Sequence, residues 1–157
     1  MQGMTKSYEA ILSMPEHQHP EGHDLIAHLV QCELESKHSK RTQLLLHNAK
    51  LRYPAYLEGI RLGMERNLSK TQIAQLAQCQ WVNSSTNILI TGATGCGKSY
   101  LSCALGHQAC LEGYKTLYLN MNRFVERITL AKADGSYIKL LNHLEKTHVL
   151  ILDDFGL

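Results

Sequence analysis

The stretch GATGCGKS, residues 92–99, constrains the fold of this chain more than any other part of its sequence. It matches the pattern G-x-x-x-x-G-K-[ST], and its required positions are Gly92, Gly97, Lys98 and Ser99. An apolar run, Asn87–Thr91, comes before it, and a segment with helical spacing of apolar residues follows. Such a loop binds phosphate, because backbone N–H groups and the positive end of the helix surround one anion. The sequence therefore predicts a P-loop nucleotide site.

The last two residues of the loop predict the ligands of this site. Lys98 would reach the β- and γ-phosphates of a nucleoside triphosphate, and the hydroxyl of Ser99 would ligate Mg²⁺. ATP and Mg²⁺ are therefore the expected cofactors. The alternative is a glycine-rich connector with an incidental Lys-Ser pair.

A second motif, VLILDDFGL at residues 149–157, supplies two carboxylates. The apolar run Val149–Leu152 is typical of a buried strand, and Asp153 and Asp154 follow at its carboxyl end. Beside a phosphate loop, Asp153 would hold the Mg²⁺ shell and Asp154 would orient or deprotonate the attacking water. The predicted catalytic residues are Lys98, Asp153 and Asp154, and the predicted metal-binding residues are Ser99 and Asp153.

The order of elements predicts an α/β fold. Strands are expected at 87–91, 115–120 and 148–154, with a helix ending near Gly113 and one or two helices over 122–147 that break at Asp134-Gly135. Alternating strands and helices predict a parallel sheet with flanking helices. Residues 1–80 are expected to be helical, with one or two amphipathic helices before Pro54 and a capping box at Ser69 and Gln72. We expect a helical domain at 1–80 and a nucleotide-binding domain at 81–157.

Composition and charge limit the kind of protein. The chain is 44% hydrophobic and 19% charged, with neither an apolar run of membrane-spanning length nor a secretion signal, so a cytoplasmic protein that does not enter membranes is expected. Acids outnumber bases from Thr5 to Glu35, and bases outnumber acids from Lys37 to Lys70. The basic stretch also contains Tyr53 and Tyr56. It suits contacts with the phosphates of duplex DNA, or it is a solvated helical face.

The motifs resemble those of a known family. NILITGATGCGKSYLSCALGHQACLEGYKTLYLN, AKADGSYIKLL and LILDDFGL look like the IstB group of insertion-sequence helper ATPases, relatives of the DnaC helicase loader within the AAA+ class. The resemblance runs from about residue 20 to the last residue. It implies a protein that binds ATP, assembles on duplex DNA and directs a transposase. Carried over to this chain, it adds contacts with the nucleotide from Gly95 to Tyr100, so the expected set is Gly92, Ala93, Thr94, Gly95, Cys96, Gly97, Lys98, Ser99 and Tyr100.

One departure from the family pattern shapes the expectations. Members of the family continue beyond the DDFG segment with two more strands, a sensor residue, an arginine finger and a lid. The resemblance therefore implies a C-terminally incomplete AAA+ module, with impaired hydrolysis, and self-association is expected of the intact family. Without the intervening strand, strands 87–91 and 149–153 must either pair directly or leave backbone groups unpaired.

Two alternatives to a transposition helper remain open at this point. A replicative-helicase loader would use the same motor and bind a helicase through its N-terminal helices. A non-enzymatic fragment would bind DNA or transposase through residues 1–80 alone.

Overall fold

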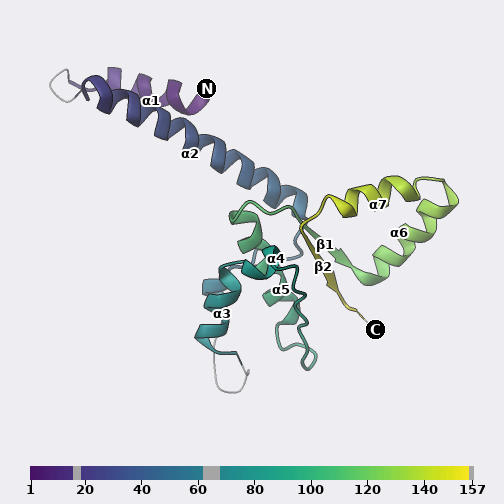
Figure 1. Ribbon diagram of the computed structural model, residues 1–157. Coiled ribbons are helices and arrows are strands. Elements are labelled where there is room, and N and C mark those ends of the chain that lie inside the picture. Colours follow the sequence, from purple (N-terminus) through teal and green to yellow (C-terminus); the bar gives the residue numbers. More distant parts are fainter. Residues whose placement is uncertain (16–18, 62–67, 156–157) are drawn as a thin grey trace. The chain divides into compact units, whose positions relative to one another are not determined.

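The computed structural model, which describes residues 1–15, 19–61 and 68–155, begins with two helices, α1 (Gln2–Leu12) and α2 (Gly22–Ala49) (Figure 1). The predicted helical segment before Pro54 is thus one long helix. The chain divides into two compact units, Met1–Leu44 and Leu45–Leu157. Within the described ranges, no helix combines the length and the apolar character needed to cross a membrane.

A carboxylate of α2 satisfies the start of α1 in the first unit. The first N–H groups of any helix lack partners within the helix. Glu33 accepts hydrogen bonds from the backbone N–H groups of Gly3, at 2.9 Å, and Met4, at 3.1 Å. These two bonds, that from Met4 first, lower the pKa of Glu33 below the usual value. The buried carboxylate is therefore paired with donors.

The second unit begins with the last turn of α2. It continues with the 3-10 turn η2 (Leu57–Gly59), the short helices α3 (Lys70–Ala77) and α4 (Gln80–Asn83), and the longer helix α5 (Lys98–Leu111). The predicted capping box is present at the start of α3. The Ser69 hydroxyl accepts from the Gln72 backbone N–H at 3.1 Å, and the Gln72 side chain accepts from the Ser69 backbone N–H at 2.9 Å.

The sheet has two strands, β1 (Thr116–Asn120) and β2 (Val149–Asp153), which run parallel. Helices α6 (Met121–Ala133) and α7 (Tyr137–Glu145) connect them. The two helices form the hairpin drawn in green and yellow in Figure 1, and they are separated at Gly135, whose φ is 76°. The register places Asn120 opposite Asp153, so both polar residues lie at the same edge of the sheet. The predicted strands at 115–120 and 148–154 and the predicted helix break are confirmed.

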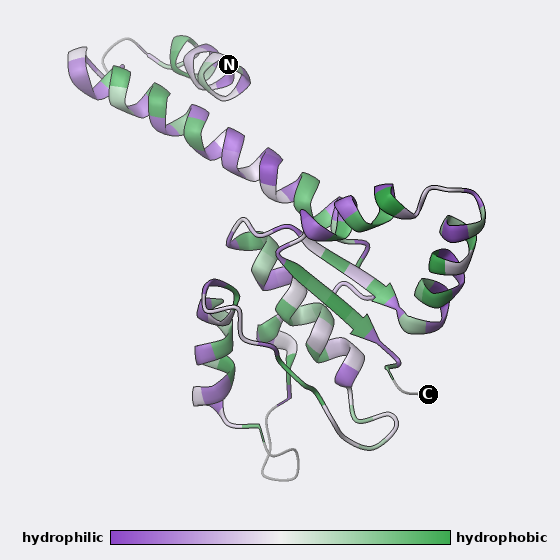
Figure 2. Ribbon diagram, turned by 45° about the vertical axis from the view of Figure 1, so that its right-hand side comes forward, coloured by the Kyte–Doolittle hydropathy of each residue, from purple (hydrophilic) through white to green (hydrophobic). Residues whose placement is uncertain are grey.

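Helix α5 packs against this sheet and contributes more buried residues to the core than any other described element. Leu101, Ala104, Leu105 and Ala109 are buried, as the apolar spacing predicts. Figure 2 shows strongly hydrophobic residues along β2. Gly106 lets the helix approach closely, because a Cβ there would lie 2.6 Å from Cδ1 of Ile151 and 3.1 Å from Cδ2 of Leu51. Two thiols of α5, Cys103 and Cys110, are completely buried in the packing.

The predicted strand Asn87–Thr91 is wrong, since these residues have no regular structure. Ile88 and Ile90 pack on the apolar cluster of Ile73, Leu101 and Leu105, while Leu89 is 85% exposed. The segment is thus held by side-chain burial. A strand also needs a hydrogen-bonded neighbour, and the sheet of the described residues consists of β1 and β2 only. Of the two outcomes weighed above, direct pairing does not occur.

The compact units do not divide the chain between residues 80 and 81. Leu57 and Ile60 of the region before residue 80 pack on Leu101 and Leu105 of α5, as does the buried side chain of Ile73. Burial of these apolar side chains joins residues 45–80 to the phosphate-loop part of the chain. The assignment of functions to 1–80 and 81–157 stays a prediction.

Candidate functional site

The loop Gly92–Gly97 leads directly into α5. Gly95 and Gly97 have φ angles of 79° and 93°, in the left-handed region that glycine adopts without strain. A Cβ on either residue would meet nothing within 4 Å, so conformation and not packing requires glycine there. All six loop residues are exposed. The loop therefore presents its backbone to solvent at the N-terminus of a 14-residue helix.

Lys98 folds back over the loop. Its Nζ donates hydrogen bonds to the carbonyl oxygens of Gly92 and Ala93, both at 2.9 Å. The ammonium group thus lies above the loop backbone. The side chain of Tyr100, which is also predicted to contact nucleotide, packs in the apolar cluster around Cys103 and Tyr118.

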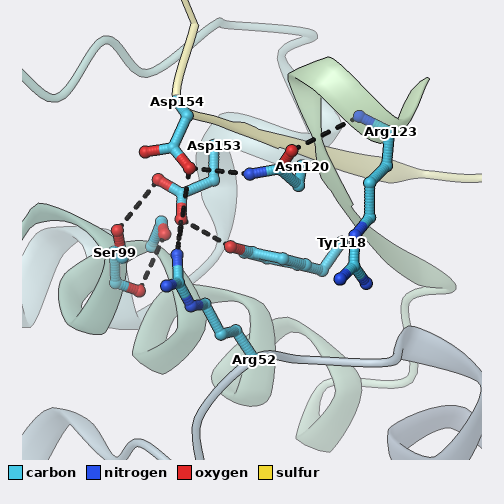
Figure 3. Close-up of polar contacts among 8 residues, drawn as sticks. Arg52, Ser99, Tyr118, Asn120, Arg123, Asp153 and Asp154 are labelled. Carbon is cyan, nitrogen blue, oxygen red and sulfur yellow. Dashed lines mark hydrogen bonds and ion pairs between the residues drawn. The ribbon is translucent and has the colours of Figure 1, made fainter. Parts of the chain in front are cut away.

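The structure brings the two motifs of the sequence together through Ser99 and Asp153. The Ser99 hydroxyl donates to Oδ1 of Asp153 at 2.9 Å, although the residues are 54 positions apart (Figure 3). Ser99 lies in the first turn of α5 and Asp153 is the last residue of β2. The packing of α5 on the sheet therefore sets this contact.

The second carboxylate oxygen of Asp153 interacts with two further side chains. The Tyr118 hydroxyl donates to Oδ2 at 2.5 Å, and Nη1 of Arg52 lies 3.5 Å from the same atom. In Figure 3 the side chains of Ser99, Tyr118 and Arg52 converge on this carboxylate. The Asp153 side chain is 11% exposed. A carboxylate with so little exposure requires the donors that surround it.

Asp154 turns away from the strand direction and has a different partner. Its φ of 58° is unusual for a residue other than glycine, and asparagine and aspartate tolerate it best. The Asn120 side chain donates from Nδ2 to Oδ2 of Asp154 at 2.7 Å. The other atom of this amide, Oδ1, accepts from the backbone N–H of Arg123 at 3.4 Å and caps α6. Asn120 therefore connects a predicted catalytic carboxylate to the start of a helix.

The surroundings of Asp153 shift two pKa values in opposite directions. Burial raises the pKa of the Asp153 carboxyl, but the hydrogen bonds from Tyr118, Ser99 and the Asp154 backbone, together with the charge of Arg52, outweigh it, and the net pKa is lower than usual. Burial, together with the hydrogen bond to Asp153, raises the pKa of the Tyr118 hydroxyl. Asp153 is therefore an anion at neutral pH, and Tyr118 is a neutral donor.

The oxygen atoms of Ser99 and Asp153 are suitable ligands for Mg²⁺. A serine hydroxyl and an ionised carboxylate are hard oxygen ligands, which this ion prefers, and it keeps several waters in protein sites of this type. Ser99 and Asp153 already lie within hydrogen-bond distance of each other at the start of the phosphate-loop helix. The residues present can therefore hold the ion beside a bound phosphate.

Three residues of this cluster were not predicted from the sequence: Arg52, Tyr118 and Asn120. Asn120 had a detectable signal, because it ends a predicted strand and therefore meets the tip of the other strand in a parallel sheet. Tyr118 lies two residues before Asn120 on the same strand and therefore on the same face, so it could be found in the same way. Arg52 gave no signal beyond its place in the basic stretch, where it was grouped with DNA-contacting residues.

Comparison with known proteins relates the whole chain to one family. The family model described as "IstB-like ATP binding protein" matches residues 1–157. A Pseudomonas fluorescens protein named as an ATP-binding protein of insertion sequence IS1162 is 40% identical over 156 residues, which cover 99% of this chain and 68% of that protein. A Sinorhizobium fredii protein named as an insertion-sequence ATP-binding protein, y4pL, is 33% identical over 155 residues, covering 99% of this chain and 63% of its own length.

A more distant relative is the Pseudomonas aeruginosa protein named as an ATP-binding protein of insertion sequence IS21, at 24% identity over 156 residues. These residues cover 99% of this chain and 59% of that relative. The matched residues thus span between 59% and 68% of the length of these three relatives.

Proposed function

The chain belongs to the family of IstB-like ATP-binding proteins, and from this premise we propose that it is a helper ATPase of DNA transposition. In this proposal it has a nucleotide-binding module of the AAA+ type behind helical segments. It binds ATP with Mg²⁺, contacts duplex DNA and directs a transposase, and it acts in the cytoplasm.

The observation that carries the proposal is the hydrogen bond between Ser99 and Asp153. Many chains contain a glycine-rich loop, and many strands end in aspartate. A nucleotide site needs both at one place, with the serine hydroxyl and the carboxylate close enough to share one hydrated cation. The 2.9 Å contact meets this requirement.

Each residue of the cluster has a part in this proposal. The N–H groups of the loop bind phosphate oxygens, and Lys98 turns from the carbonyls of Gly92 and Ala93 toward the β- and γ-phosphates. Ser99 and Asp153 hold Mg²⁺, which neutralises charge on the phosphates when bound. Asp154 accepts a proton from, or orients, the attacking water, and Asn120 fixes the direction of its carboxylate.

Support for DNA contact comes from the basic stretch Lys37–Lys70, with a narrower set of residues than the sequence suggested. Lys37 pairs with Glu33, and Arg52 lies at the acidic pair. Lys50, Arg61 and Lys70 belong to the second unit and are exposed. We expect phosphate contacts from these residues, in the salt-dependent manner of sequence-independent binding, and choose Arg61 and Lys70 for the test.

A binding experiment tests the DNA part of the proposal. Duplex DNA is titrated with the chain at several salt concentrations, with and without a non-hydrolysable ATP analogue, and the double variant Arg61→Gln/Lys70→Gln is compared. The variant should bind less tightly, and the slope of log affinity against log salt should fall by about 2, or about 1 for each lost phosphate contact. An unchanged slope would remove these residues from the interface.

A capture experiment separates the transposition helper from the helicase loader. The tagged chain, with ATP analogue and duplex DNA, is offered the transposase of the same insertion sequence and the replicative helicase of the same cell. Retention of the transposase alone is expected, because the relatives bear the names of insertion-sequence proteins. Retention of the helicase alone would favour the loader.

A further inference from the structure

The most informative feature outside the predicted site residues is that Oδ2 of Asp153 already has two partners. Tyr118 is fixed, because it belongs to β1 and is 9% exposed. Arg52 is held less firmly: its Nη1 lies 3.5 Å from Asp153 and 3.9 Å from Asp154, and its side chain is 47% exposed. The guanidinium also interacts with the Tyr118 hydroxyl, and this interaction raises the pKa of Arg52. Both ion-pair distances nevertheless exceed those of a direct N–H···O hydrogen bond, and the Arg52 side chain is half-exposed. Of the two partners of Oδ2, Arg52 is therefore the one that can leave.

The backbone around Arg52 allows such a movement of the side chain without unfolding. Arg52 lies between α2 and η2, in residues 50–56, which form neither helix nor strand. On either side the chain is anchored, since Ala55 is fully buried and Leu51 packs in the same apolar cluster. In the same conformation the guanidinium lies over the Tyr53 ring, at 5.3 Å from its centre, and this contact can persist when the side chain leaves the carboxylates.

Charge explains why an arginine is there. Two adjacent aspartates are brought to one edge of the sheet, where Asp153 is mostly buried, and the uncompensated charge would be costly. Arg52 supplies one positive charge to both carboxylates. A divalent cation held by Ser99 and Asp153 supplies two, and would repel a guanidinium so close to the same carboxylate.

We propose that Arg52 is a built-in counterion of the acidic pair that competes with the divalent cation, and that it thereby sets the Mg²⁺ concentration at which the site fills. Arg52 stabilises the ionised pair while no cation is bound. Its side chain withdraws to solvent and to the Tyr53 ring when the cation arrives. The inference deepens the proposed function and rests on it, because it takes Ser99 and Asp153 as the cation site.

The test measures cation binding without nucleotide, so that it does not depend on ATP binding. Mn²⁺ prefers the same carboxylate and water ligands as Mg²⁺, and its free concentration is read by electron paramagnetic resonance. The full chain is compared with Arg52→Gln, which removes the charge, and Arg52→Lys, which keeps it. Arg127→Gln on the exposed side of α6 is the matched control, and Arg52→Gln/Asp153→Asn shows that the cation counted is the one at Asp153.

The proposal predicts that Arg52→Gln binds Mn²⁺ about two- to five-fold more tightly than the unchanged chain, the size expected for loss of a half-exposed ion pair. The Mn²⁺ affinities of Arg52→Lys and Arg127→Gln should stay close to that of the unchanged chain. Adding Asp153→Asn to Arg52→Gln should abolish the gain in Mn²⁺ affinity. Equal or weaker Mn²⁺ binding by Arg52→Gln, or no binding to either protein, would overturn the proposal.

Nucleotide binding, measured in parallel on the same samples, keeps the two proposals apart. If Arg52→Gln tightens Mn²⁺ binding and no protein binds ATP, the proposed function fails and the role of Arg52 stands. If ATP binds and Arg52→Gln weakens both ATP and Mn²⁺ binding, Arg52 acts on the phosphates, and the counterion proposal fails while the proposed function stands.

Discussion

The hydroxyl of Ser99 and the carboxylate of Asp153 are joined by a 2.9 Å hydrogen bond that spans 54 positions of the chain. Ser99 begins the helix after the phosphate loop, and Asp153 ends a strand whose neighbour brings Tyr118 and Asn120 to the same edge. The contact thus connects the two halves of the proposed nucleotide site.

Removal of the Ser99 hydroxyl should weaken the effect of Mg²⁺ on nucleotide binding. Ser99→Ala loses both the proposed metal ligand and the donor to Asp153, whereas Ser99→Thr keeps a hydroxyl at the same place. We expect Mg²⁺ to improve ATP affinity about tenfold less in Ser99→Ala, equivalent to one charge-assisted hydrogen bond, and Ser99→Thr to resemble the unchanged chain. Titrations with Mg²⁺ and with EDTA measure this, and the same Mg²⁺ effect in all three proteins would contradict it.

The lowered pKa of Asp153 predicts how stability changes in acid. Because the pKa is lower in the folded chain than the unfolded value of about 3.9, the unfolded chain binds the proton first as pH falls. The stabilisation is therefore complete above that value and is lost as pH falls through the folded pKa. Urea unfolding between about pH 2 and pH 7 measures this dependence.

Tyr118→Phe tests the cause of that shift. The variant removes one donor to the carboxylate and keeps the ring in the core, so unfolding at pH 7 should cost about 1–2 kcal/mol less. The difference should shrink at the acid end, where Asp153 is protonated in both proteins. A difference that is constant over the whole pH range would mean that packing, and not the hydrogen bond, is responsible.

The two contacts of Asn120 can be separated by substitution. Asn120→Asp keeps an acceptor for the Arg123 N–H and replaces the donor to Asp154 with a negative charge. We expect it to lower the free energy of unfolding at pH 7 by about 1–2 kcal/mol, with recovery below about pH 4 as the introduced carboxyl is protonated. Asn120→Ala loses both contacts and should not recover. Parallel pH profiles for the two variants would contradict this account.

Gly106 should tolerate no side chain, although alanine favours helices. Gly106→Ala gains up to about 1 kcal/mol of helix propensity. The new Cβ would lie 2.6 Å from Ile151 and 3.1 Å from Leu51, and overpacking of this kind costs about 1–3 kcal/mol. Net destabilisation in urea is expected, while Gln108→Ala on the same helix should stay near the unchanged chain. A more stable Gly106→Ala would show that α5 can move away from the sheet.

Local patterns predicted most of the fold. The capping box at Ser69, the break at Gly135 and the two strands of the sheet depend on short-range sequence, and the structure has them where expected. The strand at 87–91 failed because pairing depends on a neighbour elsewhere in the chain. Its apolar residues alternate correctly between burial and exposure but have no ladder partner among the described residues.

The residues of the candidate site could be predicted from the sequence where a motif defines them. They could not be predicted where only packing brings them to the site. The loop, Lys98, Ser99 and the two aspartates follow from sequence spacing. Arg52 reaches Asp153 because the segment after α2 packs on α5 and the sheet through Leu51 and Ala55. No spacing rule contains that long-range packing, and so the basic stretch alone could not reveal the ion pair.

The central claim, that the loop binds ATP in this chain, is tested most directly by titrating the purified protein with a fluorescent ATP analogue in the presence of Mg²⁺, beside Lys98→Ala and the control Lys146→Ala. Phosphate release is followed in the same samples. The account predicts saturable binding by the unchanged chain and by Lys146→Ala, and affinity about 10- to 100-fold lower in Lys98→Ala, as for loss of a charged hydrogen bond to phosphate. Absence of saturable binding, or equal binding by Lys98→Ala, would contradict it.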